Sequence, residues 1–229
     1  MPRGQSNTTI FVGDGERRWV VRVDGFDPVK LGLSRSVEWR VLYKAAAAGL
    51  APQPAYANPD IGVLICEYLK PDDNTSESLE AIARLLRDIH CLPPVRFQLD
   101  PLQRARRYLH MSGESELPAR LLQACDELDG MPREQRLCHN DLLQANRLQH
   151  AGKVYALDWE YAAMGDPLFD LAAIIEGDKL PVQDAMTLHS VWLDHAPDEE
   201  EQRHLALQRL VYRELETLWL SATRTSTHS

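Results

Sequence analysis

Asp141, Asn146 and Asp158 are the residues of this chain whose types and spacing best suit chemistry. Asp141 and Asn146 stand five residues apart in one polar stretch, and Asp158 follows twelve residues after Asn146, at the end of an apolar run. Carboxylate and amide oxygens, with water and phosphate oxygens, are the ligands that Mg²⁺ prefers. A carboxylate one loop away could take a proton from a hydroxyl group. The three residues together indicate a metal and phosphoryl-transfer site.

The spacing of these residues also predicts their geometry. Ala151-Gly152 is predicted to form a hairpin turn between residues 147–150 and 153–157. If the turn is centred there, residues whose numbers sum to about 303 face each other, which puts Asn146 and Asp158 at the open end. Opposed residues of an antiparallel pair have Cβ atoms roughly 5 Å apart. An amide oxygen and a carboxylate at that separation can share one cation.

A structural role is the alternative for each of these residues taken alone. Asp and Asn favour loops and turns because their side chains hydrogen-bond to nearby backbone. Short matches such as HxD and DWE also arise by chance. The combination in this order is much more specific, because protein kinases use a catalytic-loop Asp, an Asn and a metal-binding Asp in the same order.

The segments around these residues carry a family resemblance. They are His139-Asn140-Asp141 with Asn146, then Asp158-Trp159-Glu160-Tyr161, then Gly165-Asp166-Pro167. The sequence resembles the aminoglycoside phosphotransferase and choline kinase superfamily, and is most similar to bacterial choline/ethanolamine or thiamine kinases. The resemblance implies that Asp141 is the catalytic base, that Asn146 and Asp158 bind Mg²⁺, and that ATP is the phosphoryl donor.

The resemblance also implies a fold. We expect an α+β, two-lobed protein-kinase-like fold, with a small antiparallel-sheet N-lobe and a larger, mostly helical C-lobe. The patterns of the chain agree, because strands flank the Gly13-Asp14-Gly15 turn and amphipathic helices follow from residue 78 onward. We therefore expect residues 1–70 to form the N-terminal nucleotide-binding lobe. Residues 71–229 would form the helical C-terminal lobe with the catalytic loop and the acceptor site.

Four residues of the N-terminal part are candidates for holding the nucleotide phosphates. Ser6 and Asn7 match the family's segment over the phosphates, although this stretch could instead be a disordered terminus. Arg22 lies in an apolar strand where the family has a phosphate-contacting cation. A cation there is costly to bury without a partner, and Glu38 on the next predicted helix, about 34–48, is the natural one. The alternative is an arginine on an edge strand that points to solvent.

Residues 67–69 are expected to form the hinge between the lobes. They end a continuously apolar strand, the second of a hairpin predicted over 55–58 and 62–69. The resemblance implies that backbone groups at Glu67 and Leu69 hydrogen-bond the adenine ring. Since any side chain could stand there, the sequence does not specify the base.

Aromatic residues close to carboxylates are the candidates for the acceptor site. Such groups can form a cage for a quaternary ammonium. The resemblance implies that the segment after Asp158 and the last helix, about 200–223, build this cage. The candidates are Trp159, Glu160, Tyr161, Tyr212 and Trp219. The alternative for each aromatic residue is ordinary packing in the core or at its rim.

Other charged residues are expected to serve the scaffold or to face solvent. His90 ends a helix predicted over 78–90 and is expected at the surface or as a cap. A solvated helix face is expected for Arg104, Arg106 and Arg107. Scaffold roles are expected for His139 in the catalytic loop and for Asp166 as the N-cap before Pro167. A scaffold role is also expected for Asp170, because the resemblance implies that its side chain reaches back to the catalytic loop.

Composition bounds the partners and the compartment. The net charge of −9 argues against a nucleic-acid partner and suits a cationic small molecule. No apolar run approaches the roughly 20 residues that span a bilayer, and no apolar segment follows Arg3 as in a signal peptide. Four scattered cysteines without metal-ligand spacing indicate reduced thiols. We expect a cytoplasmic protein without a membrane partner, and the oligomeric state stays open.

The sequence thus predicts an ATP- and Mg²⁺-dependent kinase of a small, cationic alcohol of the choline, ethanolamine or thiamine type. A sugar or aminoglycoside kinase is the second enzymatic reading. A non-catalytic nucleotide-binding module with a kinase-like fold is the alternative of another class, and an unrelated acidic α/β protein with a chance motif is a third.

Overall fold

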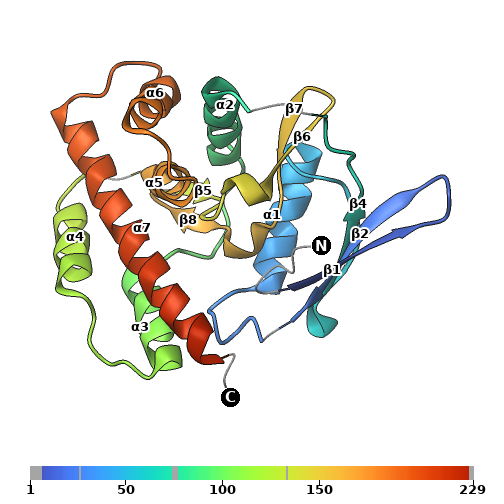
Figure 1. Ribbon diagram of the computed structural model, residues 1–229, viewed down its shortest axis with the longest axis horizontal. Helices are drawn as coiled ribbons and strands as arrows, with labels where there is room; N and C mark the ends of the chain where they lie inside the picture. Colours follow the sequence, from blue (N-terminus) through green and yellow to red (C-terminus); the bar gives the residue numbers. More distant parts are fainter. Residues whose placement is uncertain (1–6, 26, 74–76, 133, 227–229) are drawn as a thin grey trace.

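The computed structural model describes residues 7–25, 27–73, 77–132 and 134–226 (Figure 1). A four-stranded antiparallel sheet occupies its N-terminal part, with the strand order β1-β2-β4-β3. The strands are β1 (Asn7–Gly13), β2 (Arg18–Asp24), β3 (Pro54–Asn58) and β4 (Val63–Glu67). The hairpin predicted around Gly13-Asp14-Gly15 and the hairpin predicted over 55–58 and 62–69 are both confirmed. Because β2 lies between β1 and β4, the alternative that Arg22 stands on an edge strand is wrong.

Helix α1 (Arg35–Ala47) contacts both the sheet, at β3, and the short 3₁₀ helix η3 (Trp159–Tyr161). Its apolar face buries Val41 and Leu42, and two alanines near its end allow close packing. Gly49, at φ 71°, follows the helix and reverses the chain. The helix thus links the sheet to the segment after Asp158.

The rest of the described chain is mostly helical. Its helices are α2 (Leu79–His90), α3 (Pro101–Ser112), α4 (Ala119–Asp129), α5 (Pro167–Gly177), α6 (Val182–Leu193) and α7 (Glu199–Ser226). Four of them begin at side-chain caps, from Ser78, Asp100, Asp166 and Asp198. The long helix α7 packs along α3, α4 and α5, while α2 packs on α6 (Figure 1). Helix α5 is buried from Pro167 to Ile175, so it forms the centre of the helical part.

Two small two-stranded sheets lie between the four-stranded sheet and α5. Strand β5 (Arg136–Cys138) pairs with β8 (Ala163–Gly165), and β6 (Arg147–His150) pairs with β7 (Lys153–Ala156). Arg147 faces Ala156 in the second pair, which is the predicted register. Ala151 and Gly152 both have positive φ, at 52° and 75°, as a tight two-residue hairpin turn requires.

The predicted fold class, an antiparallel-sheet N-terminal part followed by a mostly helical part, is confirmed. The proposed boundary near residue 70 falls in the connection between β4 and α2, and it stays a prediction. Within the described ranges, no helix has the length and apolar character that crossing a bilayer would take.

Candidate active site

The loop between β5 and β6 carries His139, Asn140 and Asp141, and a buried carboxylate fixes its backbone. Asp170 of α5 accepts hydrogen bonds from the backbone N–H groups of His139 (2.9 Å) and Asn140. This confirms the prediction that Asp170 reaches back to the loop. Asn140 has φ 64°, a conformation that Asn tolerates better than most residues. Asp170 therefore fixes the backbone of the loop, while Asp141 faces a cavity that α5 also lines.

His139 and His90 belong to the scaffold of this loop. The Nε2–H of His139 donates to the Leu157 carbonyl (2.9 Å), and its ring packs on Trp159 with centroids 4.7 Å apart. This agrees with the scaffold role predicted for His139. The expectation that His90 lies at the surface or caps a helix is wrong, because its ring is buried and bonds to the Asp170 carboxylate at 3.0 Å. The apolar stripe of α2 continues through this histidine, so the helix turns it inward.

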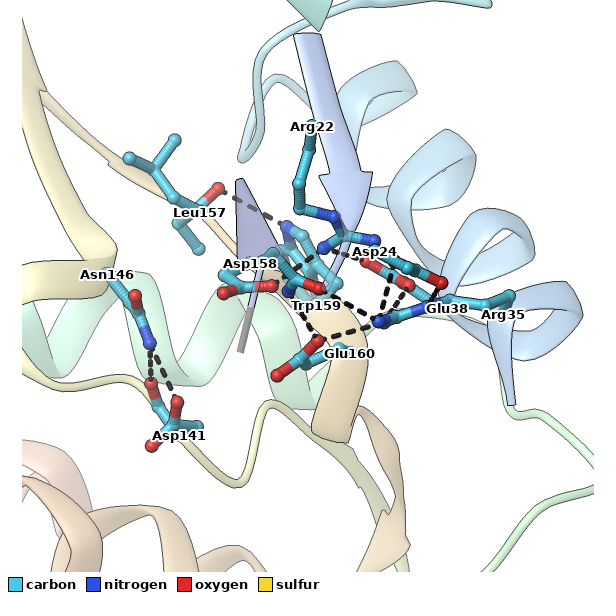
Figure 2. A network of polar contacts seen from close by, with 12 residues as sticks. Arg22, Asp24, Arg35, Glu38, Asp141, Asn146, Leu157, Asp158, Trp159 and Glu160 are labelled. Carbon is cyan, nitrogen blue, oxygen red and sulfur yellow. Dashed lines mark hydrogen bonds and ion pairs between the residues drawn. The ribbon is translucent and has the colours of Figure 1, made fainter. Parts of the chain in front are cut away.

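Asn146 orients Asp141. The Nδ2–H₂ group of Asn146 donates to the Asp141 carbonyl and to its Oδ2, both at 2.8 Å. Since both amide hydrogens turn toward Asp141, the amide oxygen of Asn146 is left for another partner (Figure 2). The predicted hairpin puts Asn146 and Asp158 at its open end, where the Leu157 N–H donates to the Asn146 carbonyl at 2.8 Å.

Asp158 takes up a strained backbone conformation next to Arg22. Its φ of 57° is uncommon for a residue other than glycine and re-aims the chain after β7. One Nη of Arg22 lies 2.8 Å from the Asp158 carboxylate and 2.5 Å from Glu38 (Figure 2). The predicted pairing of Arg22 with Glu38 is thus present, and the same guanidinium also holds Asp158.

The site concentrates negative charge in a poorly solvated place. Burial raises the pKa of Asp141, the charges of Asp158 and Glu160 raise it further, and Arg104 acts in the opposite direction. Burial likewise raises the pKa of Asp158, with Glu160 adding to the rise and Arg22 opposing it. Crowded carboxylates of this kind favour a bound cation. The Asp158 carboxylate and the available amide oxygen of Asn146 are hard oxygen donors, so these residues fit Mg²⁺.

A buried ionic network connects this site with the four-stranded sheet. Glu160 is only 5% exposed and accepts from Asn7 Nδ2 at 3.0 Å and from Arg35 Nη1 at 2.9 Å. Arg35 also bonds to Glu38 at 2.9 Å and to Asp24 at 2.8 Å (Figure 2). Sequence reasoning missed Arg35 and Asp24. The signal for Arg35 was its place three residues before Glu38 on one helix, which makes it a second partner for that glutamate.

Two cavities meet at the candidate residues. One, of about 350 Å³, lies against β1, β2 and β4 and is lined mainly by apolar side chains, among them Phe11, Val20, Leu64 and Leu148; we name it the sheet-side cavity. The other, of about 490 Å³, is bounded by α3, α5 and α7 and is named the helix-side cavity. Arg22, Asn146 and Asp158 line both cavities, whereas Asp141 lines the helix-side cavity.

The candidate nucleotide residues are divided between these cavities. Glu67 and Leu69 line the sheet-side cavity, as does Glu38. Asn7 lines the helix-side cavity instead, with its side chain engaged by Glu160, and Ser6 lies outside the described residues. Thr9 lines both cavities and was not singled out from the sequence.

The candidate acceptor residues are gathered only in part. Glu160, Tyr161, Tyr212 and Trp219 line the helix-side cavity. Trp159 does not join them, because its ring is 2% exposed, packs on His139 and lies at the wall of the sheet-side cavity.

The arginines of α3 differ from one another. The interpretation of the cluster as a solvated face is wrong for Arg104, which lines the helix-side cavity with its guanidinium carbon 4.8 Å from the centroid of the Tyr161 ring. It is also wrong for Arg107, which is half-buried and donates to the Val29 carbonyl. Arg106 is exposed, as expected. Helical periodicity alone could have separated the three, since Arg104 and Arg107 lie one turn apart beside the buried Tyr108.

Known proteins resemble this chain in sequence and in structure. The chain is 38% identical over 84 residues to a LicA homologue of Metamycoplasma hominis, a match that covers 37% of this chain and only 32% of that relative. The choline kinase LicA from Streptococcus pneumoniae superposes with a TM-score of 0.84 at 21% identity, covering all of this chain and 86% of that one. LicA in complex with AMP gives 0.83 at 22% identity, with 100% and 84% of the two chains covered.

The structural likeness shows the fold, and the predicted protein-kinase-like architecture is confirmed by it. A sequence model described as the phosphotransferase enzyme family matches residues 1–216, nearly the whole chain. This match supports the resemblance drawn from the segments around Asp141 and Asp158. The chain belongs to the phosphotransferase enzyme family.

Proposed function

We propose that this chain transfers the γ-phosphoryl group of ATP, with Mg²⁺, to a hydroxyl group of a small cationic molecule of the choline, ethanolamine or thiamine type. The observation that carries the proposal is that Arg22, Asn146 and Asp158 line both cavities, while Asp141 stands on the helix-side cavity alone. A donor in one cavity and an acceptor in the other would meet at these residues.

The sheet-side cavity suits the nucleotide. Its apolar walls could enclose an adenine ring, and Glu67 and Leu69 line it, so their backbone groups could hydrogen-bond the base. Arg22 is in reach of phosphate oxygens at the junction, where its fork of N–H donors matches phosphate geometry. The AMP complex of the similar LicA structure supports a nucleotide at this kinase-like fold.

The residues at the junction would position the reacting groups. Asn146 and Asp158 would hold Mg²⁺, which neutralises charge on the phosphate oxygens when bound. Asp141, fixed by the two hydrogen bonds from Asn146, would orient the acceptor hydroxyl and accept its proton. Since burial raises the pKa of Asp141, its carboxylate is a stronger base than an exposed aspartate. Little covalent chemistry is asked of the protein, so positioning and charge dominate.

The helix-side cavity supports an acceptor with a positive charge. Tyr161, Tyr212 and Trp219 present aromatic surfaces, and Glu216 adds a carboxylate from α7. The similar structures of the choline kinase LicA and of a choline/ethanolamine kinase family protein from Mesorhizobium loti support the same acceptor class. The size of this cavity, about 490 Å³, leaves room for a larger acceptor and keeps the sugar or aminoglycoside alternative open.

The test is a screen of ATP consumption and product formation over choline, ethanolamine, thiamine, amino sugars and aminoglycosides, with and without Mg²⁺. We expect Mg²⁺-dependent transfer to a cationic alcohol. Asp141→Asn and Asp158→Asn should each lower kcat by at least roughly 10³-fold, because each removes a group that acts in the transition state.

Asp88→Asn is the matched control, because Asp88 is an exposed aspartate of α2 away from both cavities. It should leave kcat and KM unchanged. Near-wild-type turnover in either site variant would disprove the assigned roles. A thermal shift with Mg·ATP but no turnover on any acceptor would instead favour the non-catalytic module.

A further inference from the structure

Arg104 is a cation within the helix-side cavity that the proposed mechanism does not use. It projects from α3, is half-buried, and lies over the ring of Tyr161 at 4.8 Å. Tyr161 follows the Asp158-Trp159-Glu160 segment directly, so the guanidinium stands on the acceptor side of the junction. Arg104 does not line the sheet-side cavity.

Arg104 differs from the other sequestered arginines near the site because it forms no ion pair with a described carboxylate, although its charge lowers the pKa of Asp141. Arg22 pairs with Glu38 and Asp158, Arg35 with Asp24, Glu38 and Glu160, and Arg147 with Glu77 and Asp178. Among the described residues, none forms a hydrogen bond or ion pair with the Arg104 side chain. The aromatic face offsets only part of the cost of withdrawing a guanidinium from water. An anion that enters the cavity would supply the missing partner.

A carboxylate without a cation lies on another wall of the same cavity. Glu216 of α7 is exposed toward the cavity, and no described residue forms an ion pair with it. Tyr212 and Trp219, one turn to either side of it along α7, line the cavity too. Helix α7 therefore brings a carboxylate and aromatic faces to the cavity, and α3 brings the cation Arg104.

We propose that the acceptor is a hydroxylated zwitterion, in which Arg104 holds an anionic group such as a carboxylate while Glu216 and the aromatic faces of α7 hold the ammonium. This inference rests on the proposed phosphoryl transfer and changes the acceptor class, because it keeps the ammonium group and adds an anionic group to it. The planar guanidinium offers two parallel N–H donors, which match a carboxylate better than a lone ammonium would. The hydroxyl of such a molecule would face Asp141, which lines the same cavity.

Matched acceptor pairs test this inference. L-Serine is ethanolamine with a carboxylate added, and L-homoserine is 3-aminopropanol with a carboxylate added, so each pair isolates the anionic group. We expect the wild-type protein to show a kcat/KM at least about tenfold higher for the carboxylated member of at least one pair, because a buried charged partner discriminates strongly against an analogue that lacks its counterpart.

Variants of Arg104 assign the selectivity to this residue. Arg104→Gln should lower kcat/KM for the carboxylated acceptor by roughly 10- to 100-fold more than it lowers kcat/KM for the plain amino alcohol, so that the preference between the two is lost. Arg104→Lys, which keeps the charge but loses the planar fork, should fall in between. Arg106→Gln, an exposed arginine on the same helix, is the control and should leave the ratio unchanged.

The outcomes separate this inference from the proposed function. Transfer to plain amino alcohols without a preference for their carboxylated partners would overturn the inference alone, even if no Arg104 variant folds. An equal loss on both members of a pair in Arg104→Gln would overturn it too, since Arg104 would then act on the phosphoryl group or on Tyr161. Failure to phosphorylate any acceptor would overturn both proposals together.

Discussion

At the scale of single residues, His139 shows how burial decides a protonation state. The ring is fully buried, its Nε2–H donates to Leu157, and its Nδ1 has no hydrogen-bond partner among the described residues. Burial lowers the pKa of His139 from 6.5 to about 4, against the opposing charge of Asp170. A proton added at Nδ1 would be an uncompensated charge in the core, so the folded state keeps the ring neutral.

This pKa shift predicts a pH dependence of stability. A histidine whose pKa is depressed in the folded state takes up its proton first in the unfolded state, so its contribution is complete above pH 6.5 and is lost as the pH falls toward 4. Between pH 7 and pH 5 we expect His139 to reduce the free energy of unfolding by on the order of 2 kcal/mol.

The His139→Gln variant, which keeps a donor for Leu157 but does not titrate, should lose less stability over the same range. Urea denaturation of the wild type and the variant at pH 7 and pH 5 measures the difference. The carboxylates that also titrate in this range are present in both proteins, so their contribution cancels. Equal losses in the two proteins would contradict the assignment.

The sequence predicted single residues well where a local pattern carried them. The spacing of Asp141, Asn146 and Asp158 predicted that they form one site. The free-energy cost of burying Arg22 in a strand predicted that it pairs with Glu38. It predicted less where two candidates compete for one partner. Arg35 also pairs with Glu38, and only the packing of α1 against η3 shows that it continues to Glu160. Trp159 was placed with the other aromatics by type, yet its backbone turns it into the core.

At the scale of elements, the β6–β7 hairpin fixes the separation of Asn146 and Asp158. Its turn is stabilised from outside, because the Asp72 carboxylate accepts from the N–H groups of Ala151 and Gly152, both at 2.8 Å. The turn also contains a local conflict. Ala151 has φ 52°, a left-handed conformation in which a Cβ atom is unfavourable.

Two substitutions in this turn should therefore act in opposite directions. Ala151→Asn should stabilise the protein by about 0.5–1 kcal/mol, since Asn adopts positive φ more readily and favours this turn type. Gly152→Ala should destabilise it by about 1 kcal/mol from backbone strain alone, because an added Cβ at this position meets no atom within 4 Å. Equilibrium urea unfolding checks both values, and a change of the same sign in the two variants would refute the strain argument.

The sequence predicted elements best where periodicity and caps coincide. Asp166 with Pro167 marked the start of α5, and the apolar stripe from Leu79 marked α2. The end of α3 at Ser112 is harder to predict, because the apolar pattern fades after Leu109 and before Gly113 terminates the helix. The three-residue strands β5 and β8 were not predicted as a pair. Their partners lie almost thirty residues apart, and strands this short carry no alternating pattern.

At the scale of the whole molecule, the sheet and the helical part meet in the candidate site through a few buried charges. Arg22 on β2 reaches Asp158, and Arg35 at the start of α1 joins Asp24 of the sheet to Glu160 of η3. The Arg22–Asp158 and Arg35–Glu160 contacts bridge more than 120 positions of sequence, so no local pattern could predict them. The arrangement of the two parts, and with it the alignment of the two cavities, therefore depends on the guanidinium groups of Arg22 and Arg35.

Arg35 provides the test of this dependence. Its side chain is 6% exposed, and its removal in Arg35→Met would leave Asp24, Glu38 and Glu160 buried with one cation fewer. Breaking a buried ion pair by removing one partner costs about 3–5 kcal/mol, so we expect a loss of that order in urea unfolding. Arg40→Met, an exposed arginine on the same helix, should change stability by less than about 0.5 kcal/mol.

A double-mutant cycle separates the bridge from general damage to α1. If Arg35 stabilises the molecule through Glu160, then Glu160→Gln should lower the free energy of unfolding less in the Arg35→Met background than in the wild type. In that background the Glu160 carboxylate has already lost its ion pair with Arg35. We expect a coupling free energy of about 1–3 kcal/mol between the two positions. Additive effects would show that the sheet and the helical part are held together by other contacts, and that the ionic network of Figure 2 accompanies their alignment without enforcing it.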